Sequence, residues 1–180
     1  MLNTYQFPQF AYVESPEQAS GTVLRHPVVV VGAGPVGLTA ALDLAARGLR
    51  VVVLDDNNTV SIGSRAVCYA KRPLEIWDRL GVAKPMLDKG IEWKLGRVFL
   101  RDQEVYQFDL LPEEGHKIPA FINLQQYYLE EYMVTACLAN PLIDLRWKHK
   151  VVSVQNLGDH AGLAVETPDG IFAMQADWLI

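Results

Sequence analysis

The sequence predicts an α/β fold with a parallel central sheet, and two observations near the N-terminus carry this prediction. Val28–Val31 and Val51–Leu54 are continuous apolar runs with no polar alternation, which is typical of parallel strands buried on both faces. Between them, apolar residues recur at helical spacing from Val36 to Arg47, and Gly48 ends the helix. Because such strand–helix–strand crossovers are right-handed, the two strands should be adjacent and parallel.

The rest of the chain predicts further helices and antiparallel strands. Residues 1–26 have no steady period and predict an irregular N-terminal arm whose aromatic side chains dock on the domain, which occupies residues 27–180. Turn residues and apolar runs predict the following elements: helices over Pro73–Leu80 and Leu124–Ala139, a hairpin of Val98–Leu100 with Val105–Phe108, and strands over Asp144–Trp147, Val151–Leu157, Leu163–Glu166 and Phe172–Ile180.

Composition excludes several function classes. The 180 residues contain 16 Lys and Arg against 21 Asp and Glu, a net charge of −5, which argues against a nucleic-acid partner. No apolar run approaches the ~20 residues of a membrane span, and no secretory signal precedes the first strand, so we expect a cytoplasmic protein that binds no membrane. Cys68 and Cys137 lie far apart, and the spacing of the four histidines predicts no metal site.

A glycine-rich turn joins the first strand to the first helix. Gly32, Gly34 and Gly37 form a G-x-G-x-x-G motif in the strand–turn–helix context that gives this motif its meaning. Gly32 allows the tight turn, Gly34 lets a pyrophosphate approach the backbone, and Gly37 lets the helix pack close to the sheet. Pro35 suits the first helical position, and the N–H groups that follow, from Val36 on, would hold phosphate with the helix dipole.

An acidic residue ends the second strand. Asp55 lies 18 residues after Gly37, where a carboxylate can accept hydrogen bonds from both ribose hydroxyls of an adenosine and would repel a 2′-phosphate. The predicted ligand is therefore FAD or NAD rather than NADP, and Asp56 is expected to face solvent. The turn alone does not separate FAD from NAD, because both carry an ADP half.

The segment after the second strand favours FAD over NAD. Its residues are Gly63-Ser64-Arg65-Ala66-Val67-Cys68, then Lys71-Arg72-Pro73-Leu74-Glu75-Ile76 and Leu80-Gly81-Val82. From about His26 to Ile180 the chain resembles the FAD-dependent aromatic hydroxylases, single-component flavoprotein monooxygenases of the para-hydroxybenzoate hydroxylase type. The likeness is stronger to the branch of 3-(3-hydroxyphenyl)propionate hydroxylase and pentachlorophenol monooxygenase. It implies a Rossmann-like three-layer FAD-binding domain with a parallel central sheet and an antiparallel β-hairpin layer, incomplete at the C-terminus.

The resemblance also implies cofactor-binding residues outside the glycine turn. Arg65 matches an arginine that contacts FAD; without the resemblance, a surface ion pair would be the simpler interpretation. Gln126 matches a glutamine at the start of a long helix that contacts FAD; the alternative is a helix-terminal glutamine in solvent. Val151 matches a strand residue whose backbone lies near the adenine. Residues 95–120 correspond to the possible start of a substrate domain.

The implied activity is hydroxylation of a phenolic or other aromatic small molecule by FAD, with NADH or NADPH and dioxygen as co-substrates. Assembly into a homo-oligomer is left open. Two other hypotheses remain: another Rossmann-type FAD- or NAD-dependent oxidoreductase, or a nucleotide-binding fragment inactive by itself.

No catalytic acid, base or nucleophile is assigned in these residues. Glu113-Glu114 and Glu130-Glu131 are interpreted as solvated charges, and the histidines as structural or exposed. The chain stops inside an apolar strand, Ala176-Asp177-Trp178-Leu179-Ile180, so we expect a piece of a longer enzyme that is inactive alone.

Overall fold

The computed structural model describes residues 5–63 and 65–180, which divide into two compact units. The first unit comprises the residues up to Gly63 and those from Glu130 to Ile180, and the second comprises Ser64–Leu129. Among the described residues, no helix is both long and apolar enough to cross a membrane.

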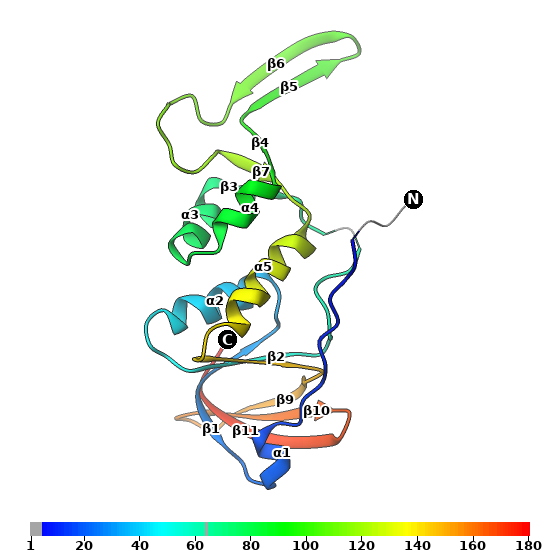
Figure 1. The fold of residues 1–180 in the computed structure, drawn as a ribbon, viewed down its shortest axis with the longest axis vertical. Helices are drawn as coiled ribbons and strands as arrows, with labels where there is room; N and C mark the ends of the chain where they lie inside the picture. The colour runs from blue at the N-terminus through cyan, green and yellow to red at the C-terminus, as the bar shows by residue number, and fades with distance from the viewer. Residues whose placement is uncertain (1–4, 64) are drawn as a thin grey trace. The chain divides into compact units, whose positions relative to one another are not determined.

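A six-stranded mixed sheet forms the centre of the first unit (Figure 1). The strand order is β8-β2-β1-β11-β10-β9, in which β8, β2, β1 and β11 are parallel and β10 and β9 continue antiparallel. The strands are β1 (Arg25–Val31), β2 (Val51–Asp55), β8 (Ile143–Trp147), β9 (Lys150–Asn156), β10 (Ala161–Thr167) and β11 (Gly170–Leu179). The predicted adjacent, parallel pairing of the first two strands is confirmed, with Val30 opposite Val53.

The two faces of the parallel strands bury different partners. Helix α2 (Pro35–Ala45) packs on β1 and β2, and the Val30 side chain points towards it, beneath Gly37. Val29, Val52 and Leu54 alternate to the other face, where they form one core cluster with residues of the antiparallel strands: Leu163, Val165, Met174 and Ala176. Helix, parallel strands and antiparallel strands thus give the predicted three-layer α/β arrangement.

Gly48 ends α2 as the sequence predicts. Its φ is +82°, its N–H donates to the Ala45 carbonyl at 2.9 Å, and the Leu49 N–H donates to the Leu44 carbonyl at 3.2 Å. This pair of bonds is a Schellman closure, which needs a residue in the left-handed region and so favours glycine.

The N-terminal arm is more ordered than its sequence predicts. It contains α1 (Pro16–Ser20), with Ser15 as N-cap and Gly21 in the left-handed conformation after its end, and β1 begins at Arg25. The predicted docking of aromatic side chains occurs: the Phe10 ring stacks on Trp147, and Tyr12 lies against His149.

The second unit combines short strands and helices. Its elements are β3 (Cys68–Ala70), α3 (Lys71–Arg79), α4 (Ala83–Lys89), β4 (Ile91–Trp93), β5 (Leu95–Leu100), β6 (Gln103–Asp109) and β7 (Phe121–Asn123), and α5 (Gln126–Leu138) continues from it into the first unit. β3, β7 and β4 form a three-stranded antiparallel sheet, whereas β5 and β6 form a separate hairpin. The hairpin, α3 and α5 were predicted by the sequence; α4 and the three short strands were not.

Candidate cofactor site

The glycine turn is built as the motif requires. Gly32 has φ +105°, and its N–H donates to the Leu54 carbonyl at 2.8 Å, which extends the contact between β1 and β2. A Cβ on Gly37 would collide with the Gly32 carbonyl oxygen and come within 3.2 Å of the Val30 side chain. Gly37 therefore allows the close approach of helix and sheet that the sequence predicts.

The N-terminus of α2 offers backbone donors without a side-chain cap. Gly34 is the N-cap, Pro35 is the first helical residue, and no described side chain caps the helix. A Cβ on Gly34 would meet nothing within 4 Å, and Val36 is 82% exposed. The N–H groups ahead of the first intrahelical bond, from Leu38 to the Gly34 carbonyl at 3.0 Å, thus lie at an open, positively polarised helix end that suits a phosphate.

Asp55 is tied to the glycine turn by its side chain. Its Oδ2 accepts from the Ala33 N–H at 2.6 Å and its Oδ1 from the Asn57 N–H at 2.8 Å. A carboxylate has about four acceptor positions, so both oxygens keep capacity for a ribose hydroxyl. Asp56 is exposed, as predicted. The hydrogen bond from the Ala33 N–H to the Asp55 carboxylate was not predicted, because the identity of a residue does not show where its backbone N–H points.

The turn between β8 and β9 lies against the end of β2. The His149 N–H donates to the Asp55 carbonyl at 2.8 Å, and the Lys148 N–H donates to the Asn57 carbonyl at 2.9 Å. Val151 follows on β9, half-buried against the core cluster that contains Leu54. The structure therefore brings the glycine turn, Asp55 and the segment leading to Val151 together in the first unit.

Arg65 and Gln126 belong to the second unit, where they are brought near each other in the fold. Gln126 begins α5, and its Oε1 accepts from the Ala66 N–H, next to Arg65, at 3.3 Å. Gln126 is half-buried, unlike the exposed Gln125. Arg65 is exposed and forms no ion pair with any described residue. Ser64, which the resemblance includes, lies outside the described residues.

One expected surface charge is buried. Glu130 is 3% exposed, and its Oε2 accepts from the Ser61 N–H at 2.6 Å, so its interpretation as a solvated charge is wrong. Because α5 packs this side chain under the loop after β2, the carboxylate exchanges water for a backbone donor. His149 is also buried, and burial lowers its pKa, which fits a structural role. Burial raises the pKa of Cys137 to about 12.

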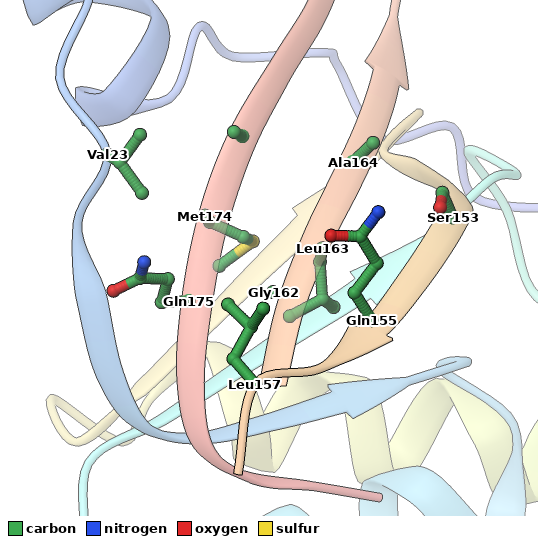
Figure 2. A pocket seen from close by; sticks show the side chains of 10 residues that line it. Val23, Ser153, Gln155, Leu157, Gly162, Leu163, Ala164, Met174 and Gln175 are labelled. Atoms are coloured by element: carbon green, nitrogen blue, oxygen red, sulfur yellow. The ribbon is translucent and has the colours of Figure 1, made fainter. Parts of the chain in front are cut away.

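A shallow groove lies elsewhere on the first unit. Its volume is about 290 Å³, and Gly162, Gln155 and Gln175 place it on the face of β9–β10–β11 that points away from the core cluster (Figure 2). Leu157 lies over Gly162, 3.1 Å from where a Cβ would stand. The described residues that line this groove carry no ionisable side chain. The glycine turn therefore remains the candidate site for a charged cofactor.

An open helix end, a glycine turn and an anchored aspartate at the carboxyl ends of adjacent parallel strands define a dinucleotide-binding α/β domain. The chemistry of these residues fits the ADP half of FAD, because uncapped N–H groups suit phosphate oxygens and a carboxylate suits ribose hydroxyls. The FAD binding domain family model matches residues 25–180. The chain belongs to this family, and FAD is the cofactor its family name specifies.

Known relatives agree with this assignment. The chain is 28% identical over 157 residues to a para-nitrophenol 4-monooxygenase of Pseudomonas sp. (strain WBC-3), which covers 84% of the chain and 38% of the relative. It is 31% identical over 166 residues to the 6-hydroxy-3-succinoylpyridine 3-monooxygenase HspB of Pseudomonas putida (strain DSM 28022 / S16), covering 87% and 40%. Hydroxylases named for 3-(3-hydroxy-phenyl)propionate also match, at 21% identity in Mycolicibacterium smegmatis.

Among solved structures, the p-nitrophenol 4-monooxygenase PnpA of Pseudomonas putida DLL-E4 superposes with a TM-score of 0.80 at 28% identity, covering 88% of this chain and 40% of that one. The chain thus spans about 40% of the length of the two Pseudomonas relatives and of PnpA, and 27% of the length of the Mycolicibacterium smegmatis hydroxylase. The predicted resemblance to FAD-dependent aromatic hydroxylases is confirmed.

Proposed function

We propose that this chain is the FAD-binding portion of an NAD(P)H-dependent flavoprotein monooxygenase that hydroxylates a phenolic or other aromatic small molecule. The relatives named for aromatic substrates support the activity.

One observation carries the cofactor half of the proposal. The Asp55 carboxylate is fixed by two backbone N–H groups, one of them within the glycine turn. The same turn leads to the uncapped N-terminus of α2. The glycine turn and the hydrogen-bonded end of β2 therefore offer an anion for a ribose and donors for a pyrophosphate side by side.

Each residue has a binding role in this proposal. Gly34 and the N–H groups of Val36 and Gly37 hold the pyrophosphate, and Asp55 accepts from the adenosine ribose. Val151 supports the adenine end, whereas Arg65 donates to cofactor oxygens with Gln126 beside it. Bound FAD supplies the redox chemistry, by accepting hydride from the nicotinamide and activating dioxygen. The chain's residues bind and orient it.

The test is a titration of the purified chain with FAD, followed by flavin fluorescence, with NAD and ADP as competitors. We expect FAD to bind, ADP to compete, and NAD to displace it weakly. Binding of NAD in preference to FAD would instead indicate a dehydrogenase, and absence of binding to FAD, NAD and ADP would overturn the proposed site.

A further inference from the structure

The N-terminal arm lies outside the region that defines the family. The FAD binding domain match begins at residue 25, yet the preceding residues, in dark blue in Figure 1, run along the first unit and end in α1. Within its described residues the arm is attached by specific contacts around Phe10 and in α1, so it is an integral part of the first unit.

Phe10 contacts residues that adjoin the candidate site. Its ring stacks on Trp147 with centroids 4.5 Å apart and planes within 8°. Its backbone N–H donates to the Asn58 carbonyl at 2.8 Å, and the Asn58 side chain donates to Gln9 at 3.0 Å. Phe10 thus contacts two segments at once, the loop after β2 and the last residue of β8, which leads into the β8–β9 turn.

These two segments are the ones that hold Asp55. Asn57 donates its N–H to the Asp55 side chain, and His149 donates its N–H to the Asp55 carbonyl. Phe10 bonds to the neighbour of Asn57 and stacks two residues before His149 in the sequence. The Lys148 N–H also bonds to the Asn57 carbonyl. The β8–β9 turn is therefore linked to the loop after β2 directly through Lys148, and a second time through Phe10.

The arm is fixed further along by buried polar contacts. Glu17, whose side chain is fully buried, accepts from Arg146 at 2.9 Å and lies 2.5 Å from His26 Nε2. The Gln18 side chain donates to Thr167 at 2.8 Å. These contacts attach the segment that follows Phe10 to the first unit.

We propose that Phe10 is a positioning residue for the cofactor: by clamping Asn58 and Trp147, it holds the Asp55 carboxylate in the orientation that receives the adenosine ribose. This inference rests on the proposed function, because it takes Asp55 as the ribose acceptor. Phe10 acts through Asp55: a substitution that removes its ring keeps the backbone bond to Asn58 but frees Trp147, the β8 residue in register with Asp55. It removes no group that touches FAD.

The experiment compares Phe10→Ala and Phe10→Leu with Phe10→Tyr, which keeps an aromatic face, and with Val13→Ala as a matched control. Val13 lies on the same arm and is 72% exposed. Two quantities are measured: the Kd for FAD, and the hydrogen exchange of the Ala33 and Asn57 amides, which report directly on the Asp55 carboxylate. Circular dichroism confirms folding, and Phe10→Leu replaces Phe10→Ala if the latter unfolds.

We expect loss of the aromatic pair to raise the FAD Kd roughly three- to tenfold and to speed exchange of both amides. Phe10→Tyr and Val13→Ala should stay near the wild type. In an Asp55→Ala background, Phe10→Ala should add little. Unchanged Kd and exchange, or an equal rise in Kd in both backgrounds, would overturn the inference. If the wild type binds no FAD, the proposed function fails, and amide exchange still decides whether Phe10 positions Asp55.

Discussion

Gly34 and Gly37 stand three residues apart in the same turn but meet different surroundings. A side chain on Gly37 would enter the space between the helix and the Gly32 carbonyl, whereas one on Gly34 would enter open space. Gly34 has φ −83°, which any residue adopts. The two positions therefore separate what the fold requires from what a ligand requires.

We predict that Gly37→Ala destabilises the chain by about 1–3 kcal/mol, the usual cost of overpacking, and that Gly34→Ala changes stability by less than about 0.5 kcal/mol. Urea unfolding measures both. Gly34→Ala should nevertheless weaken FAD binding, because the added methyl stands where the pyrophosphate approaches. If both variants cost the same stability, the assigned roles of the two glycines are wrong.

Residue-scale prediction from the sequence succeeded where the backbone dictates the residue type. Gly32, Gly37 and the exposed Asp56 lie as expected, because a motif in its strand–turn–helix context fixes their geometry. Glu130 was misassigned because two adjacent carboxylates, Glu130 and Glu131, are typical of a solvent-exposed surface. Only the fold shows that the Ser61 N–H donates to the Glu130 carboxylate. The cofactor contacts of Arg65, Gln126 and Val151 stay predictions.

At the scale of elements, the long periodic segments were predictable and the short ones were not. The three-residue strands β3, β4 and β7 are too short to show a period, and their pairing depends on residues far along the chain. Helix α4 was not predicted because it contains Pro85, and proline usually marks the end of a helix or a turn. The helix in the arm did carry a signal: Ser15-Pro16 at its start and Gly21 at its end.

The buried charges beneath α1 predict a pH dependence. Burial alone would raise the Glu17 pKa, but hydrogen bonding from His26 and its own backbone, with the nearby Arg146 charge, lowers it to about 2 from 4.5. Asp144, bound to Arg146, and His149 are the other charged or titratable groups nearby. A depressed pKa stabilises the fold above the unfolded value, so this contribution is present above pH 4.5 and is lost as the pH falls towards 2.

Stability measured by urea unfolding should therefore fall by up to about 3 kcal/mol through this one group as the pH drops across that window. Glu17→Gln should be less stable near neutral pH and should show a flatter profile. Parallel profiles for the two proteins would contradict the assignment of Glu17.

The β5–β6 hairpin should be the least protected regular element of the second unit. Val98, Phe99, Leu100, Val105 and Tyr106 are all at least 45% exposed, and a two-stranded hairpin alone is marginally stable. We predict that Val98 and Tyr106 amides exchange much faster than those of Val29 and Val53, measured by hydrogen exchange with NMR detection. Equal protection would mean that the hairpin is stabilised by contacts beyond its own pairing.

At the scale of the whole molecule, the chain contains an FAD-binding domain match and two compact units. The chain spans 40% or less of the length of the relatives it matches, and both Arg65 and Val36 face solvent. The parallel pairing of β1 and β2 with helix α2 was predictable from the apolar runs and the crossover rule, and the antiparallel layer was implied by the family resemblance. The division at Gly63 and Glu130 was not, because α5 runs through both units.

We predict that the chain given FAD, NADH and a panel of phenols yields no hydroxylated product. Oxygen chemistry at an open site in water is diverted to hydrogen peroxide, because hydroxylation requires exclusion of water around the reacting atoms. Oxygen uptake, peroxide assay and chromatography of the phenols check this. Stoichiometric formation of a catechol would show that these residues suffice for the reaction.

The central claim is that the Asp55 carboxylate receives the adenosine ribose of FAD, and the most direct measurement compares the FAD dissociation constants of Asp55→Ala and Asp56→Ala. Loss of charge-assisted hydrogen bonds worth about 1.5–3 kcal/mol should raise the Kd of Asp55→Ala roughly 10- to 150-fold. Asp56→Ala removes the same atoms from the neighbouring residue, whose side chain is exposed. This variant should bind FAD as the wild type does. Equal Kd values for the two folded variants would contradict the claim.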